Sequence, residues 1–174
     1  MSEKHRRHFL KNKEATTFLE KASEKLKVDL EQIFRAKVNV ELVETEFAEI
    51  FLINGKPILV KAEENVFPTL VFKEFFILAP KVVVDMGAVP HVCSGANIMA
   101  PGIARFEGEF GKGDLVFVVD ERHGKPIAVG EIIYDLETAK KVSQGIVVRN
   151  IHFVGDRIWN FVKKLTGKVG ESEI

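Results

Sequence analysis

The stretch DMGAVPHVCSGANIMAPGI, residues 85–103, combines features that an ordinary solvated loop lacks. It holds three glycines and two prolines, yet its charged side chains are limited to Asp85 and, when protonated, His91. Glycine permits backbone conformations closed to other residues and lets another molecule approach the main chain closely. The apolar run Val82–Val84 before it predicts a buried strand. We interpret residues 85–103 as a backbone-rich recognition surface on a small β-domain.

A small, uncharged, glycine-lined wall suits the close approach of a sugar-phosphate backbone such as that of RNA, which is read through unpaired bases, phosphates and 2′-hydroxyls. We expect main-chain amides and carbonyls near Ala88, Gly95, Ala96 and Asn97 to face a nucleotide. Cations outside the stretch would then attract the phosphates: Arg105, Lys112, Arg149 and His152. Two alternatives stay open. The glycines can serve only to shape a helix that crosses a barrel, or the surface can dock a peptide.

The first 78 residues predict an α+β unit. Local signals support it, since Asn-Gly between apolar segments is typical of a tight hairpin and Asn or Asp favours a helix start. In chain order we predict a helix over 13–27 capped by Asn12, a turn capped by Asp29, a strand over 38–43, a hairpin at Asn54-Gly55 and a helix over 69–76.

A basic cluster lies at the N-terminus, where Lys4–Arg7 are joined by His8. It is typical of a solvated arm or an edge strand. The alternative is a patch that contacts phosphates.

The pattern changes to mostly β near Pro80. Short apolar runs at close spacing, separated by turn residues, predict a small closed or partly closed barrel. In chain order we expect strands over 105–107, 115–119, 126–133, 146–148 and 151–154, an exposed hairpin tip over 120–125, and a short helix over 136–143 capped by Asp135. The last predicted strand is broken at Arg149-Asn150. Residues 161–174 are polar and predict a frayed tail.

Composition excludes several classes of protein. No apolar run reaches the length of a membrane span, and no secretory signal is visible, so we expect a cytoplasmic protein without membrane contact. The single cysteine, Cys93, rules out an internal disulfide and a cysteine-cluster zinc site. Twenty-five basic and 25 acidic residues cancel, so any attraction for RNA must come from a local patch. The many Lys, Glu, Val and Ile residues fit a thermophile.

No catalytic group stands out. The five histidines are scattered, Cys93 lacks an evident base, and neither a P-loop nor a dinucleotide fingerprint is present. We therefore expect a protein that is not an enzyme and that needs no metal or cofactor.

Several separated segments together carry a family resemblance. Their order and spacing resemble the malignant-T-cell-amplified-sequence proteins, which are translation-machinery-associated proteins with a pre-PUA domain followed by a PUA domain. The resemblance covers roughly residues 30 to 160. The matching segments are FPTL at 67–70, FFILAP at 75–80, VDMGA at 84–88, SGANIMAPG at 94–102 and GIVVRNIHFVGDRIW at 145–159.

The resemblance implies the architecture and the site. It predicts an α+β pre-PUA domain over 1–78, a mostly β PUA pseudo-barrel over 79–160 and a tail over 161–174. PUA domains bind RNA with the helix and loop after the first strand, the next strand and the last strand. Carried over by motif, the RNA-binding residues are Ala88, Ser94, Gly95, Ala96, Asn97, Met99, Pro101, Gly102, Val148, Arg149 and Asn150, with Arg105 and Lys112 added as cations.

The resemblance also implies a function. Members of this family act with the small ribosomal subunit and tRNA in initiation, reinitiation or recycling. They work with a partner that carries a translation-initiation-factor-like domain. We expect this chain to lack that domain and therefore to act with a separate partner protein. The alternative is an RNA-binding specificity subunit for an RNA-modifying enzyme, such as a pseudouridine synthase or a tRNA transglycosylase.

Overall fold

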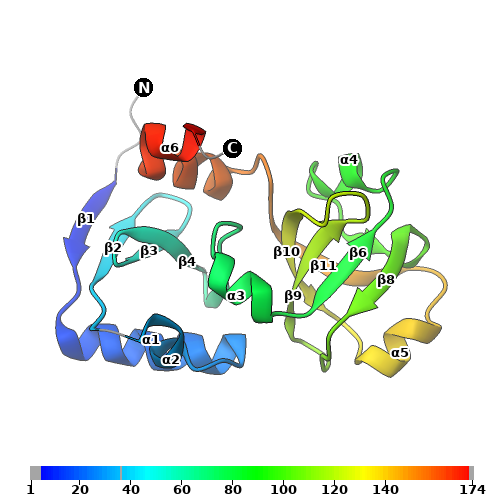
Figure 1. Cartoon of the computed structure of the whole chain (residues 1–174), viewed down its shortest axis with the longest axis horizontal. Coiled ribbons are helices and arrows are strands. Elements are labelled where there is room, and N and C mark those ends of the chain that lie inside the picture. Colours follow the sequence, from blue (N-terminus) through cyan, green and yellow to red (C-terminus); the bar gives the residue numbers. More distant parts are fainter. Residues whose placement is uncertain (1–4, 36, 173–174) are drawn as a thin grey trace. The chain divides into compact units, whose positions relative to one another are not determined.

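The computed structural model describes residues 5–35 and 37–172, and side chains up to residue 167. Lys4 of the basic cluster and the last two residues of the predicted tail lie outside the described residues. The chain divides into two compact units, one formed by residues 1–72 with 160–174 and the other by residues 73–159. Each unit is described by itself (Figure 1).

The first unit is built on an antiparallel sheet with the strand order β1-β2-β3-β4-β5. Its strands are β1 (Arg6–Phe9), β2 (Val40–Glu44), β3 (Glu49–Ile53), β4 (Lys56–Ala62) and β5 (Asn65–Pro68). The predicted hairpin at Asn54-Gly55 is confirmed, because both residues join β3 to β4 with positive φ angles of 51° and 84°. The edge strand β1 is exposed along its whole length.

Helix α1 (Asn12–Leu26) covers one face of this sheet. Its buried residues Ala15, Leu19, Ala22 and Leu26 recur at helical spacing, as the sequence pattern requires. Lys11 occupies the N-cap position, so the helix begins one residue before the predicted one. Asp29 caps α2 (Leu30–Phe34) as predicted, since its carboxylate accepts hydrogen bonds from the amides of Glu31 and Gln32.

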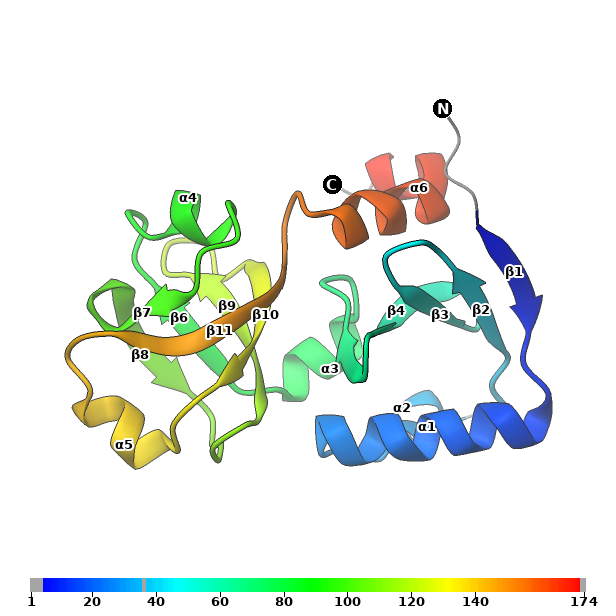
Figure 2. The same ribbon diagram turned by 180° about the vertical axis from the view of Figure 1, so that it is seen from behind.

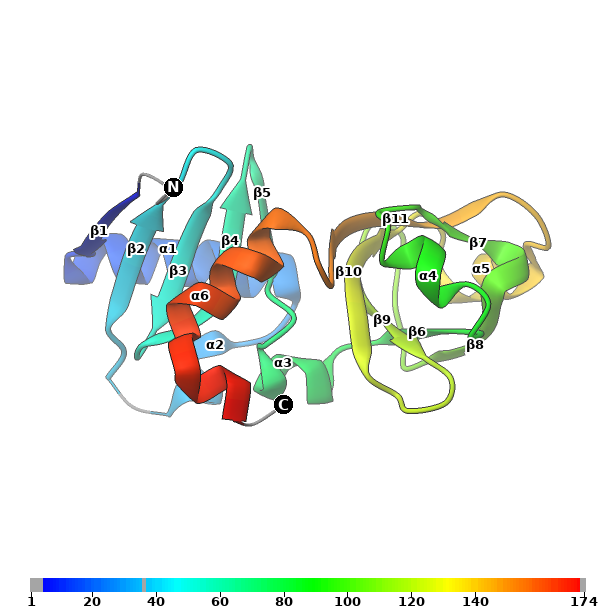
Figure 3. The same ribbon diagram turned by 90° about the horizontal axis from the view of Figure 1, so that it is seen from above.

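The opposite face of the sheet is covered by α6 (Arg157–Ser172), as Figures 2 and 3 show. The prediction of a frayed tail is therefore wrong for residues 161–172. Phe161 and Val162 are buried, and the Phe161 ring packs edge-on against Phe47. A pair of adjacent apolar residues thus outweighs the polar composition around it. The helical path is interrupted at Gly167, where φ is 60°.

The second unit is a strongly bent sheet with the strand order β7-β11-β10-β9-β6-β8. Its strands are β6 (Lys81–Val84), β7 (Ile98–Met99), β8 (Ile103–Glu107), β9 (Leu115–Asp120), β10 (Pro126–Ile132) and β11 (Ile146–Phe153). All neighbours are antiparallel except β6 and β9, which run parallel. The predicted mostly β pseudo-barrel is confirmed.

Strand β11 runs unbroken through Arg149-Asn150, where the sequence predicts a break. The irregularity lies in the pairing instead, because the β10–β11 register shifts between Val129 and Gly130. This β-bulge bends the strand pair and lets one long strand follow the barrel.

Two short helices close the ends of the barrel. Helix α4 (Val89–Val92) lies at one end and α5 (Leu136–Lys141) at the other (Figures 1 and 2). Asp135 caps α5 as predicted, since its carboxylate accepts the Thr138 amide at 2.8 Å. The core between the two helices is a continuous cluster of valine, isoleucine, alanine and one phenylalanine.

Helix α3 (Lys73–Leu78) belongs to the second unit, whereas the sequence placed a helix over 69–76 in the first. The rings of Phe75 and Phe76 both pack on Phe117 of β9. Lys81 fixes the junction with β6, because its ammonium donates to the carbonyls of Phe76 and Ala79 at 2.7 and 2.9 Å. These two contacts explain why α3 joins the barrel.

Candidate functional site

The two ends of the glycine-rich stretch are tied together beside Asp85. The Asp85 carboxylate accepts the Ala88 amide at 2.8 Å, and the Asp85 amide donates to the Gly102 carbonyl at 2.9 Å. A Cβ on Gly102 would lie 3.1 Å from the Cβ of Ala88, closer than most Cβ contacts. Gly102 is therefore needed for the closure of the loop.

We expected main-chain amides and carbonyls near Ala88, Gly95, Ala96 and Asn97 to face a nucleotide, and three of these amides already have partners within the protein. The Gly95 amide donates to Val92 at 3.0 Å and the Ala96 amide to His91 at 3.0 Å. The Ala88 amide is bonded to Asp85. The Gly95 and Ala96 donors are used in the turn that follows α4, and the Ala88 donor is used where α4 begins, so a ligand cannot recruit them without breaking local structure.

Two amide side chains, Asn97 and Asn150, bind the stretch to the last barrel strand. Asn150 Nδ2 donates to the carbonyls of Val92 and Ala96 at 3.1 and 2.9 Å, and the Asn150 amide donates to Asn97 Oδ1 at 2.9 Å. We call this arrangement the asparagine clamp. Both residues were predicted to bind RNA, and the geometry gives both a structural role.

Gly95 brings the stretch into contact with the end of β11. Its φ of 96° is a conformation that side chains other than glycine rarely adopt. A Cβ there would lie 3.2 Å from the ring of Phe153. The half-buried Gly95 therefore serves close packing of the loop on the barrel.

The predicted site residues differ in exposure. Val148 is fully buried in the core, so its side chain cannot contact a ligand. Ala88, Gly95, Gly102 and Asn150 are half-buried. The remaining residues are exposed: Ser94, Ala96, Asn97, Met99, Pro101, Arg105, Lys112 and Arg149.

An exposed strip crosses the β7–β11 edge of the barrel. Met99 and Ile146 are direct register partners, and 46% and 39% of their surfaces are exposed. His91, Ala96 and Arg149 are exposed on the elements next to them. We call these five residues, together with Ser94, the loop strip. An apolar pair flanked by a cation is a surface on which an unpaired base can lie.

The predicted cations are not all near this strip. Lys112 lies in a turn whose Gly113 amide donates to the Ile132 carbonyl at 2.8 Å, where β10 ends and the chain leads into α5. That end of the barrel is opposite α4 (Figures 1 and 2). Arg105 forms a salt bridge with Glu107 at 3.1 Å.

Sequence reasoning missed a group of cations on the turn between β9 and β10. Arg122, His123 and Lys125 are exposed there. The Glu121 amide donates to the Val84 carbonyl at 3.0 Å, so the turn lies beside the start of the glycine-rich stretch. The sequence predicted an exposed hairpin tip here, but only the hydrogen bond from Glu121 to Val84 shows that the tip lies beside the glycine-rich stretch.

Asp120 organises this turn from beneath. Its carboxylate is buried and accepts the amides of His123 and Lys125. Burial alone raises the pKa of Asp120, but these amides and the nearby His123 outweigh it and hold the pKa below the usual value for aspartate. The turn is therefore rigid where its basic side chains leave the barrel.

Asp156 forms a second polar anchor at the end of β11. Its carboxylate accepts the Phe153 amide at 2.9 Å and the Trp159 amide at 2.7 Å, and it lies 2.8 Å from Nδ1 of the buried His152. Burial raises the pKa of Asp156, but the bond and charge of His152 and the two amides together lower it below the usual value.

We expect acid to destabilise the protein through Asp156. A lowered pKa in the folded state means that the ionised carboxylate stabilises the fold above the unfolded-state value of 3.8. That stability is lost as the pH falls through the folded pKa. Asp156→Asn should therefore lower the free energy of unfolding at neutral pH and flatten its decline between pH about 5 and about 2. Denaturant unfolding across this range tests the prediction, and equal pH profiles for both proteins would contradict it.

Neither a nucleophilic cysteine nor a cluster of metal ligands is indicated among the described residues. Cys93 is half-buried, and burial raises the pKa of its thiol, which disfavours a nucleophilic thiolate. Within residues 5–35 and 37–172, no three His, Cys, Asp or Glu side chains gather as metal ligands. No described helix is long and apolar enough to cross a membrane.

Comparisons with known proteins agree with this architecture. Residues 80–154 match the PUA domain, and residues 6–73 match a domain of unknown function, DUF1947. A PUA-domain structure from Aeropyrum pernix K1, a tartrate complex, is 26% identical with a TM-score of 0.79 over 91% of each chain. A hypothetical protein of Pyrococcus horikoshii OT3 is 30% identical with a TM-score of 0.75 over 91% of this chain and 100% of its own.

Sequence relatives narrow the class further. An uncharacterised protein of Methanocaldococcus jannaschii is 38% identical over 90% of this chain and 96% of its own. Translation machinery-associated protein 20 of Saccharomyces cerevisiae is 30% identical over 76% of this chain and 77% of its own. Malignant T-cell-amplified sequence 1 of Rattus norvegicus is 32% identical over 75% of both chains.

The fold and these matches define a two-domain PUA protein with an α+β pre-PUA domain in front. The coverage and identity of the relatives make the assignment finer. The chain belongs to the family of translation machinery-associated protein 20 and malignant T-cell-amplified sequence 1.

Proposed function

We propose that the protein is a non-enzymatic RNA-binding protein of the translation machinery and that its PUA unit holds RNA on the loop strip. The observation that carries the proposal is the exposed pair Met99 and Ile146, with the exposed Arg149 three residues further along β11. The asparagine clamp joins the glycine-rich stretch to this strand. The family names support the place of action, since one relative is named for association with the translation machinery.

The proposed mode of RNA binding follows from which hydrogen-bond donors of the loop already have partners within the protein. The Ala88, Gly95 and Ala96 amides are used internally, so contact comes from side chains and from the shape of the loop. A base stacks on the Met99–Ile146 pair, while Arg149 and the basic turn at 122–125 attract the phosphates. The small residues Ala96 and Pro101 leave room for the sugar-phosphate chain.

The partners we propose are ribosomal or transfer RNA and the small ribosomal subunit in the cytoplasm. A protein with a translation-initiation-factor-like domain is a further proposed partner, in initiation, reinitiation or recycling. Co-sedimentation from native lysate tests this assignment. Migration with small ribosomal subunits supports it, and exclusive migration with an RNA-modifying enzyme would replace it by the role of a specificity subunit.

Arg149→Ala is expected to weaken RNA binding with little effect on stability, because the side chain is exposed on β11. Loss of one phosphate contact should reduce the slope of log K against log salt by about 0.7 for single-stranded RNA. Lys112→Ala is the matched control, since it removes one exposed cation at the other end of the barrel and should leave the slope unchanged. Equal slopes for Arg149→Ala and the unaltered protein would exclude Arg149 from the site.

A further inference from the structure

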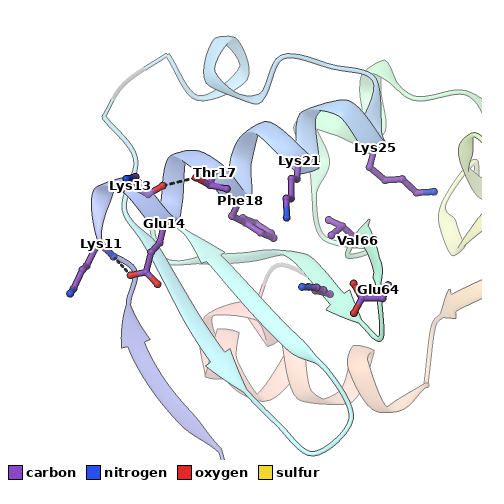
Figure 4. Close-up of a pocket in the computed structure, with 10 residues that line it drawn as sticks. Lys11, Lys13, Glu14, Thr17, Phe18, Lys21, Lys25, Glu64 and Val66 are labelled. Carbon is purple, nitrogen blue, oxygen red and sulfur yellow. Dashed lines mark hydrogen bonds between the residues drawn. The ribbon is translucent and has the colours of Figure 1, made fainter.

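The first unit contains a groove that the proposed PUA interface does not use. It runs along the exposed side of α1 beside β4 and β5 and has a volume of about 880 Å³ (Figure 4). We call it the α1 groove. Its walls are formed by Lys11, Lys13, Glu14, Thr17, Phe18, Lys21, Lys25, Lys61, Glu64 and Val66.

The α1 groove is basic although the chain as a whole is neutral. Five lysines line it against two glutamates, whereas the full sequence holds 25 cations and 25 anions. One of the glutamates is already engaged, since Glu14 accepts the Lys11 amide at 3.2 Å in the capping box of α1. The excess of positive charge attracts an anionic ligand.

The lysines of α1 that line the groove are separated by multiples of four residues. Lys13, Lys21 and Lys25 are separated by eight and four residues, so they lie on one stripe of α1 with Thr17 between the first two. Each step of four residues advances about 6 Å along a helix. A row of cations spaced about 12 and 6 Å apart along a helix can contact several phosphates of a nucleic-acid backbone, in which every nucleotide carries one charge.

An aromatic side chain adds a second feature typical of single-stranded RNA sites. The Phe18 ring is partly exposed between these lysines (Figure 4). One of its faces stacks on Phe51 with ring centroids 3.7 Å apart and planes inclined by 14°. This contact fixes the ring, so the part exposed to the groove offers a preordered apolar surface for a base.

We propose that the α1 groove is a second RNA-binding surface, which holds the phosphate backbone of a single-stranded segment along the lysine stripe with Phe18 beneath a base. The site extends the proposed function, because it places RNA contact on the pre-PUA unit independently of the loop strip. It requires no movement of the described residues, since the groove is already open.

Amine-reactive footprinting of the full chain tests the placement directly. Polyuridylate should protect Lys13, Lys21 and Lys25 from acylation while leaving the exposed Lys37 reactive. Polyglutamate is the comparison polyanion and should protect them weakly. Unchanged reactivity of the three lysines with polyuridylate bound, or protection of Lys37 to the same degree, would overturn the proposal. Stronger protection by polyglutamate would also overturn it and assign the groove to an acidic polypeptide.

A charge-matched pair of variants gives the energetic test. Lys13→Ala, Lys21→Ala and Lys25→Ala combined should lower polyuridylate affinity at least tenfold and reduce its salt slope by about 2, because three phosphate contacts disappear. Lys37→Ala, Lys112→Ala and Lys140→Ala combined remove the same charge outside the groove and should have little effect. Equal losses in both triple variants would overturn the proposal.

The proposals for the α1 groove and for the loop strip can be contradicted separately. If the groove variant binds normally while Arg149→Ala is weakened, the groove proposal fails and the PUA proposal stands. If only the groove variant is weakened, the loop strip fails as the RNA site.

Discussion

Replacing Gly130 with alanine should destabilise the barrel more than any other single-methyl change proposed for this protein. A Cβ at this position would collide with Val148 Cγ1 and would lie 2.8 Å from the Arg149 carbonyl oxygen. Both neighbours belong to β11, and Val148 is fully buried, so the strand pair must open at the bulge to admit the methyl group. We expect a loss of about 3 kcal/mol, at the upper end of overpacking costs.

Equilibrium denaturant unfolding of the full chain measures this loss. Gly111→Ala is the matched control, because its nearest neighbour would be an Asp114 carboxylate oxygen at 3.8 Å, an ordinary contact. Its free energy of unfolding should change by less than about 1 kcal/mol. A Gly130→Ala protein as stable as the control would mean that the β10–β11 bulge is not packed as described.

Removing the asparagine clamp should have the second largest effect. Asn150→Ala deletes both hydrogen bonds to the carbonyls of Val92 and Ala96. The Val92 carbonyl keeps its bond from the Gly95 amide, so we expect the loss of two hydrogen bonds of about 1 kcal/mol each, about 2 kcal/mol in total. We also expect faster hydrogen exchange at the amides of residues 92–97 and weaker RNA binding, since the loop strip loses its support.

Asn97→Ala is the comparison variant, because it also removes a polar side chain but deletes fewer hydrogen bonds than Asn150→Ala. It removes one hydrogen bond, from the Asn150 amide, on an exposed side chain, so the expected loss is about 1 kcal/mol or less. Denaturant unfolding and hydrogen exchange of both variants test whether the clamp orders the loop. If Asn150→Ala leaves exchange at residues 92–97 unchanged, the clamp does not order the loop.

Local signals in the sequence predicted local structure well. Asn54-Gly55 specified a hairpin and Asp29 a helix start because each acts through bonds within a few residues. The mostly β second half was predictable from apolar runs and turns. The α6 helix was not, because the contact of Phe161 with Phe47 joins residues far apart in the chain.

The sequence predicted that the glycine-rich stretch is exposed in large part, but not how its amides are bonded. The glycine-rich stretch does form a surface at one end of the barrel, but its Ala88, Gly95 and Ala96 amides bond to carbonyls three to five residues earlier. Sequence spacing alone does not reveal which donors a turn consumes. The role of Asn150 was equally hidden, since its partners Val92 and Ala96 lie more than fifty residues away.

The positions of the basic residues could not be predicted from the sequence either. Lys112 follows the glycine-rich stretch closely in sequence but lies at the α5 end of the barrel, next to the end of β10. The residues Arg122 and Lys125 are more distant in sequence, and the bond from Glu121 to Val84 places their turn beside the stretch. Proximity along the chain was therefore a poor guide to the charge around the loop strip.

Ultraviolet crosslinking of the full chain in native lysate, followed by sequencing of the attached RNA and mapping of the modified peptides, tests the central claim most directly. We predict ribosomal or transfer RNA attached to peptides that contain residues 91–99 and 146–149. RNA attached only to other parts of the second unit, or a protein that captures no RNA there, would contradict the claim that the loop strip is an RNA-binding face.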